Sequence, residues 1–345
     1  MEFFWKRDWI MKILVTGAAG FIAGYVIEKL LKLEHTVIGI DNYSKYGETK
    51  KTYDKNSNYN FYYHDAKDVS FLKNHLSECD HFIHLASKIG GIRYFNLLSY
   101  DLLAENERLI AAAMDAAIYA NKFCRLKKIT VISSSMVFEN ATIFPTKESH
   151  IDKFPSPSST YGFQKLACEY FAKGAWEQYR LPYTIIRPFN CAGIGETKPL
   201  CEKSNNEIGL SHVIPDLCKK ILMKQNPLHI LGNGSQIRCY TYGGDIADGI
   251  IISLENKNAK NQTFNISANQ SISVLELAKL INYKINGTRI LNFVYDKAPR
   301  YDVQKRIPNV EKAKRLLKFE ATTSLDKILD EVIPWIDEMI KANKI

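Results

Sequence analysis

The sequence predicts an α/β fold, a Rossmann-type doubly wound parallel sheet with a smaller C-terminal α/β substrate-binding lobe. Three observations favour it. A short apolar segment near the N-terminus runs directly into a glycine-rich turn and a helical pattern. Strand and helix patterns then alternate as far as Asn190, and shorter elements separated by Gly and Asn follow from Cys191. Such alternation is typical of parallel sheets with helices on both faces.

The first strand, turn and helix predict a phosphate site. The strand is predicted over 13–16, the turn over 17–20, and the helix begins at Phe21. This order directs backbone N–H groups and the positive end of a helix towards one point, which suits a pyrophosphate. The glycines permit positive φ and close approach of the ligand.

Asp41 follows a second predicted strand, over 37–40, and lies 24 residues after Gly17. A carboxylate at about this distance, ~20 residues on, hydrogen-bonds the adenosine ribose diol and repels a 2′-phosphate, which favours NAD over NADP. The nearby Lys45 could soften this preference. The alternative is that Asp41 only caps the turn before Asn42.

The rest of the sequence pattern predicts the order of strands, helices and loops and the division into domains. Further strands are predicted over 61–64, 81–85, 129–133 and 183–186, long helices over 97–121 and 159–179, a polar surface excursion over 44–60 and a polar loop over 193–211. We expect an NAD-binding domain over 11–190, with later returns near 236–265, and a mainly nucleotide-sugar-binding lobe over 191–345. Ligands of such folds bind beyond the carboxyl ends of the strands.

Composition and charge limit the function classes. The 345 residues are 46% hydrophobic and 24% charged, as in ordinary globular proteins. The net charge of +9 comes mostly from lysines scattered among Asn and Ile, so a solvated surface is favoured over a nucleic-acid track. A basic cleft for a diphosphate fits the same charge.

Cysteine usage and hydropathy indicate a cytoplasmic protein. Seven cysteines form no C-x-x-C pair, which predicts reduced thiols, no disulfide framework and no metal site: residues 79, 124, 168, 191, 201, 218 and 239. The N-terminus loosely resembles a signal peptide, but Lys12 interrupts the apolar run, which is needed as the first strand, and Met11 is a candidate start. We expect no membrane span.

Tyr161 and Lys165 open the second long helix and suggest catalysis. Positions i and i+4 share a helix face, so the phenol and the ammonium are neighbours. A free phenol titrates near about 10, and a nearby Lys⁺ with an oxidised nicotinamide would lower that pKa towards a useful range for a general base. The serines 133–135 end the preceding strand and supply a hydroxyl. The alternative is a tyrosine that only packs at the start of a helix.

Several motifs occur together in an order that resembles one family. They are Thr16-Gly-Ala-Ala-Gly-Phe-Ile, His84-Leu-Ala, Ser133-Ser-Ser, Tyr161-x-x-x-Lys165 and Arg187-Pro-Phe-Asn190, continued by segments 211–215, 232–238 and 306–309. The chain resembles the extended short-chain dehydrogenase/reductases, and among them the NAD-dependent nucleotide-sugar epimerases and dehydratases, especially UDP-glucose 4-epimerase-like enzymes.

The resemblance implies roles for individual residues. Tyr161 would be the general base, Lys165 would bind the nicotinamide ribose and tune Tyr161, and Ser134 would hydrogen-bond the sugar oxygen. The residues that would bind NAD are Gly17, Ala19, Gly20, Phe21, Ile22, Asp41, Asn42, Asp65, Ala66, Leu85, Ala86, Ser87, Lys88, Tyr161 and Lys165. Those that would hold the nucleotide sugar are Ser135, Asn190, His212, Val213, Arg238 and Arg306.

Departures from the family pattern narrow the reaction. In sugar 4,6-dehydratases Ser135 and Met136 would be an Asp-Glu pair, and decarboxylases keep a Glu at the second place. A thioether cannot transfer protons, so both reactions lose a key group. Lys88-Ile-Gly-Gly91 resembles GDP-sugar epimerase-reductases, but their acid/base cysteine would also fall at Met136. His212 stands where many UDP-sugar epimerases carry Asn, and the alternative is a polar loop histidine.

These considerations favour a UDP-sugar 4-epimerase that keeps NAD bound and works through a transient 4-keto sugar. The alternatives are a nucleotide-sugar oxidase, reductase or dehydratase of the same group, and a non-catalytic dinucleotide- or RNA-binding module. The intact Tyr161/Lys165 pair argues against the last, and no nucleic-acid or membrane partner is expected. Helices 97–121 and 159–179 carry more apolar surface than one sheet face needs, and because relatives form a four-helix bundle with such helices, a homodimer is expected.

Overall fold

The computed structural model describes residues 10–197, 212–298 and 301–345. Expectations that concern residues 1–9, Cys201, Ser211 and most of the loop 193–211 lie outside these described residues.

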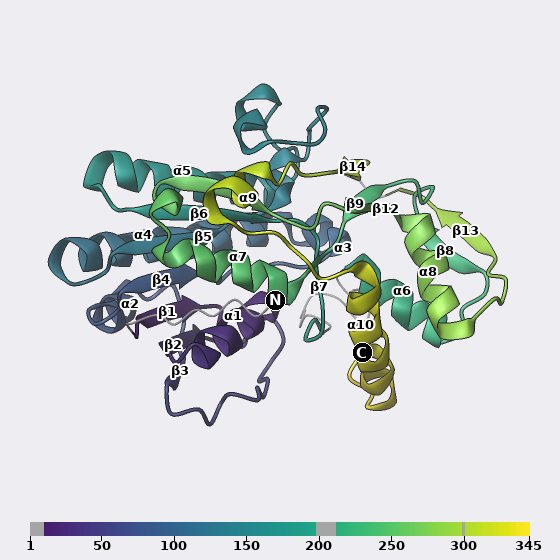
Figure 1. The fold of residues 1–345 in the computed structure, drawn as a ribbon, viewed down its shortest axis with the longest axis horizontal. Coiled ribbons are helices and arrows are strands. Elements are labelled where there is room, and N and C mark those ends of the chain that lie inside the picture. The colour runs from purple at the N-terminus through teal and green to yellow at the C-terminus, as the bar shows by residue number, and fades with distance from the viewer. Residues whose placement is uncertain (1–9, 198–211, 299–300) are drawn as a thin grey trace.

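One parallel sheet dominates the structure. Its strands are β1 (Lys12–Thr16), β2 (Thr36–Asp41), β3 (Tyr59–Tyr63), β4 (His81–His84), β5 (Lys128–Ile132), β6 (Tyr183–Pro188) and β11 (Gln262–Ile266). They are hydrogen-bonded in the order β11-β6-β5-β4-β1-β2-β3, and each neighbouring pair is parallel. The order reverses direction at β1, as in a doubly wound fold, and the predicted fold class is therefore confirmed (Figure 1).

Helices cover both faces of the sheet because its strands are apolar on both sides. In β1, Ile13 and Val15 pack into one core cluster and Leu14 packs into the other. The first cluster includes residues of α1 (Phe21–Lys32), α7 (Gly243–Glu255) and α9 (Glu311–Leu317). The second includes residues of α2 (Val69–Leu76), α4 (Ser99–Phe123) and α5 (Thr160–Tyr179).

A smaller lobe lies beside the sheet (Figure 1). It contains α6 (Val213–Leu222), α8 (Val274–Asn286), α10 (Leu325–Lys341), the pair β8 (Leu228–Leu231) and β13 (Phe293–Asp296), and a sheet of β12 (Ser271–Ser273), β9 (Ile237–Cys239) and β14 (Lys305–Arg306). The three helices share a separate core cluster with β8. β7 (Cys191–Ala192) pairs in parallel with β10 (Thr241–Tyr242). The remaining short elements of the described residues are α3 (Ile92–Leu97) and the 3-10 helices η1 (Ser135–Phe138), η2 (Glu148–Lys153) and η3 (Lys257–Ala259).

The chain returns to the sheet after it has entered the smaller lobe. β11 pairs with β6, and α7 packs on α1, close to the expected returns near 236–265. α9 returns as well, further along the chain than expected.

The segment 44–60 is only partly the surface excursion that its polarity predicts. Tyr53 and Tyr59 are buried in the core cluster beneath α1, and β3 begins at Tyr59, two residues before the predicted strand. Their phenol rings meet edge to face, with centroids 5.2 Å apart. The prediction was wrong here because aromatic residues that anchor the segment to the core were counted with its polar residues.

Two further observations concern the described residues. The six cysteines among them are all free thiols. No described helix combines the length and the hydropathy that crossing a membrane requires.

A buried ion pair joins the second long helix to the sheet. The Arg187 and Glu169 side chains are 1% and 0% exposed, and Nε and Nη2 of the arginine donate to the two carboxylate oxygens at 2.8 and 2.7 Å. Ser133 Oγ donates to the same carboxylate at 2.7 Å, and Nη1 of Arg187 donates to the Glu148 carbonyl at 3.2 Å. The pair therefore ties α5 to β6, to the end of β5 and to η2.

Replacing Glu169 by Ala should destabilise the protein by about 3–5 kcal/mol, because Arg187 would remain buried without a counter-charge. The measurement is urea denaturation followed by tryptophan fluorescence. Glu177, exposed on the same helix, supplies the control: Glu177→Ala should change stability by less than about 0.5 kcal/mol. Equal denaturation midpoints for the two variants would contradict a structural role of the pair.

Candidate functional site

A large cavity of about 460 Å³ lies at the carboxyl ends of the strands and extends to the smaller lobe. All of the residues that the sequence predicts for catalysis, for NAD and for the nucleotide sugar line this cavity. They come from the segments after β1, β2, β3, β4, β5 and β6, from α5, and from α6, β9 and β14. The sequence motifs therefore converge on one site.

The turn after β1 has the form of a phosphate cradle. Gly17 has φ +73°, and a Cβ atom there would lie 2.7 Å from the Ala86 backbone nitrogen, so only glycine fits. Gly20 caps α1 without a side-chain hydrogen bond, and the first turn of α1 contains no acidic residue. The N-terminal amides of α1 are thus available to an anion, which fits the pyrophosphate of a dinucleotide.

Asp41 lies in the cavity and also stabilises the turn. Its Oδ2 accepts from the Ala19 N–H at 3.1 Å and its Oδ1 accepts from the Tyr43 N–H at 2.7 Å. Burial raises the pKa of Asp41, and these two backbone hydrogen bonds oppose that rise. The sequence alternatives, a ribose ligand and a turn cap, are therefore compatible at this position.

A buried amide that sequence reasoning missed fixes the segment after β4. Asn106 on α4 is 2% exposed, its Oδ1 accepts from the Lys88 N–H at 2.6 Å, and its Nδ2 donates to the Lys88 carbonyl at 2.9 Å. Ser87 Oγ donates to the same Oδ1 at 3.2 Å. The signal in the sequence is a polar residue among the apolar positions of the predicted helix 97–121.

Tyr161 is positioned at the first turn of α5. Ser159 caps this helix through the Gly162 N–H, and the Glu139 carboxylate accepts from both the N–H and the hydroxyl of Ser159. The Tyr161 ring is 5% exposed and stacks on Phe95 with the centroids 4.4 Å apart. The general-base candidate is therefore held in an apolar part of the cavity.

The electrostatics of Tyr161 differ from the sequence expectation. Burial raises its pKa to about 12, whereas the Ser134 hydroxyl and the positive charge of Arg306 act to lower it. The Lys165 ammonium, which was expected to lower this pKa, instead donates to the Ile132 carbonyl at 3.0 Å. Burial lowers the pKa of Lys165, because it disfavours the charged ammonium. Arg306 is thus the protein cation that favours phenolate in this structure.

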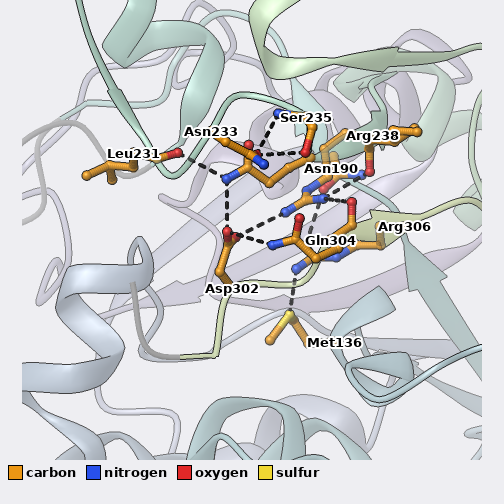
Figure 2. A network of polar contacts seen from close by, with 11 residues as sticks. Met136, Asn190, Leu231, Asn233, Ser235, Arg238, Asp302, Gln304 and Arg306 are labelled. Atoms are coloured by element: carbon orange, nitrogen blue, oxygen red, sulfur yellow. Dashed lines mark hydrogen bonds and ion pairs between the residues drawn. The ribbon is translucent and has the colours of Figure 1, made fainter. Parts of the chain in front are cut away.

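The cavity lining also contains two arginines on neighbouring strands. β14 pairs with β9 in parallel, with Arg306 opposite Arg238 (Figure 2). Arg306 Nη1 donates to Asn190 Oδ1 at 3.3 Å and Nη2 contacts the Met136 sulfur at 2.9 Å, while its buried Nε has no hydrogen-bond partner. The nearest carboxylate to Arg238 is that of Asp302, with an N···O distance of 3.8 Å.

Among the described residues, no carboxylate lies within hydrogen-bonding distance of either guanidinium. Burial first, and then the neighbouring Arg238, lowers the pKa of Arg306 to about 9. A thioether is a weak acceptor, so the contact with Met136 compensates little of the charge. Two buried guanidiniums with free donors make a site for a dianion such as a diphosphate.

His212 lies at the edge of the cavity as the N-cap residue of α6, and Val213 is the first residue of that helix. Nδ1 of His212 pairs with the carboxylate of Glu196, and Glu196 is 1% exposed. Sequence reasoning missed Glu196, because nothing in the polar loop distinguishes it from its neighbours. His212 therefore has a buried carboxylate as its partner, and its contact with a substrate stays a prediction.

Lys45 and Tyr46 also line the cavity. The prediction that 44–60 is a surface excursion is therefore wrong at these two residues too. Instead of pointing to solvent, this part of the segment reaches the space between the strand ends. No cluster of three or more potential metal ligands occurs among the described residues.

Known proteins of similar sequence and structure fall into one enzyme group. A protein of Bacillus subtilis (strain 168) named as an uncharacterized UDP-glucose epimerase is 28% identical over 347 residues, covering 96% of this chain and 100% of that protein. UDP-N-acetyl-alpha-D-glucosaminuronate decarboxylase of Bacillus cytotoxicus is 25% identical and covers 95% of this chain and 98% of that protein. The crystal structure of UDP-glucuronic acid 4-epimerase from Bacillus cereus, in complex with UDP-glucuronic acid and NAD, superposes with a TM-score of 0.79 at 26% identity, covering 95% of this chain and 100% of the other.

These relatives include both epimerases and decarboxylases. They support an NAD-dependent enzyme of this group, but they do not distinguish which reaction it catalyses. The glycine cradle, Asp41 and the Tyr161/Lys165 pair fit an NAD cofactor. A sequence model of the NAD dependent epimerase/dehydratase family matches residues 13–267, and the chain belongs to this family.

Proposed function

We propose that this protein is a 4-epimerase of a UDP-linked sugar. The observation that carries the proposal is one cavity that combines a proton-transferring phenol with two guanidiniums. Tyr161 and Ser134 line this cavity together with the paired guanidiniums of Arg238 and Arg306, and Arg306 contacts Met136, which packs on Tyr161. A nucleotide sugar has the same arrangement, a reactive sugar beside a diphosphate.

The roles of the protein groups follow from their positions. Bound NAD supplies the acceptor and donor of hydride at the sugar carbon. Tyr161 Oη takes the proton of the C4 hydroxyl and returns it, and the Ser134 hydroxyl orients the sugar oxygen. Arg306 stabilises the phenolate through its charge while its free donors bind the diphosphate. Retention of the sugar by its diphosphate leaves the ring free to present either face.

The residues beside Tyr161 support epimerisation over elimination or decarboxylation. The helix η1 contains Ser135 and Met136 and no carboxylic acid. Met136 is 6% exposed and packs with Tyr161 and Val303, so the position where a second acid or base would act is apolar. A 4-epimerase needs only one proton-transferring group, which this site has.

The nucleotide is proposed from the relatives. The Bacillus cereus structure contains UDP-glucuronic acid with NAD, and another similar structure, of the Thermotoga maritima UDP-glucose 4-epimerase, contains UDP-glucose. We infer a UDP-sugar for this chain by similarity.

Incubation with UDP-hexoses, UDP-N-acetylhexosamines and UDP-uronic acids should yield a C4 epimer without net NADH. The measurement is NMR of the products without added cofactor. Tyr161→Phe should lower turnover by roughly 10³-fold, because the proton acceptor is lost, while bound NAD stays at the wild-type level. Products that have lost water or CO₂, or full activity of the variant, would contradict the proposal.

Arg306→Gln should move the rising limb of the pH profile of kcat upward by roughly one pH unit. The positive charge lowers the pKa of Tyr161, so its removal raises that pKa and the phenolate forms only at higher pH. Arg238→Gln is the matched control, because Arg238 also faces the diphosphate but is not among the charges that act on Tyr161. Arg238→Gln should raise KM and leave the rising limb of the pH profile at its wild-type position. If the limb lies at the same pH in the wild type and in both variants, the proposed effect of Arg306 is excluded.

We further infer a homodimer through α4 and α5. These helices pack against each other on one face of the sheet, and their outer surfaces expose large aromatic side chains. The exposed residues are Tyr100, Tyr119, Phe123, Phe163, Tyr170, Phe171 and Tyr179. Monomeric proteins rarely expose so many aromatic residues on two adjacent helices, and a twofold pairing of the same two helices would cover them.

Light scattering coupled to size exclusion should give the mass of a dimer for the wild-type protein. Tyr170→Glu should give a monomer, because a carboxylate would be buried in the interface. Tyr283 is 63% exposed on α8, as Tyr170 is on α5, so Tyr283→Glu is the matched control and should stay dimeric. A monomeric wild type, or a dimeric Tyr170→Glu, would refute this interface.

A further inference from the structure

Tyr25 on α1 ties the segment that follows β7 to the helix of the glycine turn. Its hydroxyl oxygen accepts from the Ile194 N–H at 2.8 Å, and the hydroxyl donates to the Ile194 carbonyl at 3.2 Å. One phenol thus satisfies both backbone groups of a residue that lies outside every described strand and helix. The conformation of this segment therefore depends on a side chain from a distant part of the sequence.

Two glycines make room for the Tyr25 ring. A Cβ atom at Gly193 would lie 2.3 Å from Tyr25 Oη, and a Cβ atom at Gly243, the first residue of α7, would lie 2.5 Å from a ring carbon. A side chain at either glycine would therefore have to displace the phenol. The ring also meets Tyr242 edge to face, with the centroids 5.3 Å apart. Tyr25 is thus enclosed by residues from α1, from the segment after β7 and from the start of α7.

The segment that Tyr25 holds leads directly to a buried carboxylate. Glu196 is two residues after Ile194, is 1% exposed, and pairs with Nδ1 of His212. Burying a carboxylate is costly unless its partner stays in place, so this contact fixes both residues. His212 is the N-cap residue of α6 and lines the cavity. A continuous series of contacts therefore runs from Tyr25 on α1 to His212 at the smaller lobe.

We propose that Tyr25 is a positioning residue for the nucleotide sugar. The inference rests on the proposed function, because it takes His212 to face the nucleotide of the substrate. Tyr25 does not itself line the cavity. It acts by holding Ile194, which keeps Glu196 and His212 in the conformation that completes the cavity wall. Loss of the hydroxyl should therefore weaken nucleotide binding and leave proton transfer at Tyr161 unchanged.

Amide hydrogen exchange tests the two hydrogen bonds without any ligand. Tyr25→Phe keeps the ring in place and removes both bonds, so the Ile194 amide should exchange roughly 3- to 10-fold faster than in the wild type. Tyr53→Phe is the matched control. Tyr53 is buried in the same core cluster as α1, but its hydroxyl has no hydrogen-bond partner among the described residues. This variant should exchange at Ile194 as the wild type does. An unchanged rate in Tyr25→Phe would overturn the proposal.

Nucleotide affinity tests the consequence for the site. The Kd for UDP, measured by isothermal titration of the enzyme with its NAD bound, should rise roughly 3- to 10-fold in Tyr25→Phe and stay at the wild-type value in Tyr53→Phe. Glu196→Gln removes the charge that pairs with His212 and should weaken UDP binding by a similar factor. Because Tyr25 acts through Glu196, the double variant should bind UDP no more weakly than the weaker single variant. Losses that multiply would show two independent effects and would overturn the proposed role.

Steady-state kinetics separate positioning from a general loss of structure. Tyr25→Phe should raise KM for the nucleotide sugar, while kcat and the content of bound NAD stay within about twofold of the wild type. A fall in kcat at unchanged KM, or loss of NAD, would assign Tyr25 to the reaction or to the cofactor site and would contradict the proposal. Failure of every UDP-sugar to react would refute the proposed reaction alone, because hydrogen exchange and the UDP titration need no turnover.

Discussion

The ion pair between Glu169 and Arg187 is the constraint on which the geometry of the site depends. It is fully buried, and its carboxylate also accepts from Ser133, the residue next to Ser134. Lys165 is one helical turn before Glu169, and Tyr161 is one turn before Lys165. The pair therefore fixes the catalytic helix relative to the end of β5. Burying two charges is costly unless their hydrogen bonds are complete, and here both oxygens and three guanidinium nitrogens have partners.

The same burial that orders Tyr161 opposes its chemistry. A phenol surrounded by Phe95, Met136 and Val303 resists ionisation, and the nearest helpful charge belongs to Arg306, on a strand of the other lobe. The base thus depends on a residue that is also proposed to bind the diphosphate. The activity of the first part of the chain requires the correct folding of the last part.

Much of the site was predictable because its residues follow strands directly. In a parallel sheet the carboxyl ends of β1, β2, β4, β5 and β6 lie at one edge. Motifs that follow these strands directly therefore converge there, independently of the conformation of the loops. Tyr161 and Lys165 were predicted from their helical spacing together with the serines that end the preceding strand and the glycine turn upstream. These parts depend on local sequence and on one topological rule.

Other parts were not predictable because they depend on contacts between distant segments. The pairing of β9 with β14 sets Arg306 against Arg238, and no pattern in two such short strands reveals it. Lys45, Glu196 and Asn106 are single polar residues in a polar segment, a loop and a long helix, respectively. Their roles follow from where the chain turns. Lys165 was assigned to Tyr161 from spacing, but the nearby Ile132 carbonyl competes for its ammonium.

The register of β9 and β14 also links ligand occupancy to the stability of the smaller lobe. Two like charges on neighbouring strands repel each other, and each raises the free energy of the folded lobe when no anion lies between them. If these arginines bind a diphosphate, as proposed, the ligand would convert that repulsion into two attractions. Binding would then raise the stability of the smaller lobe as well as hold the ligand.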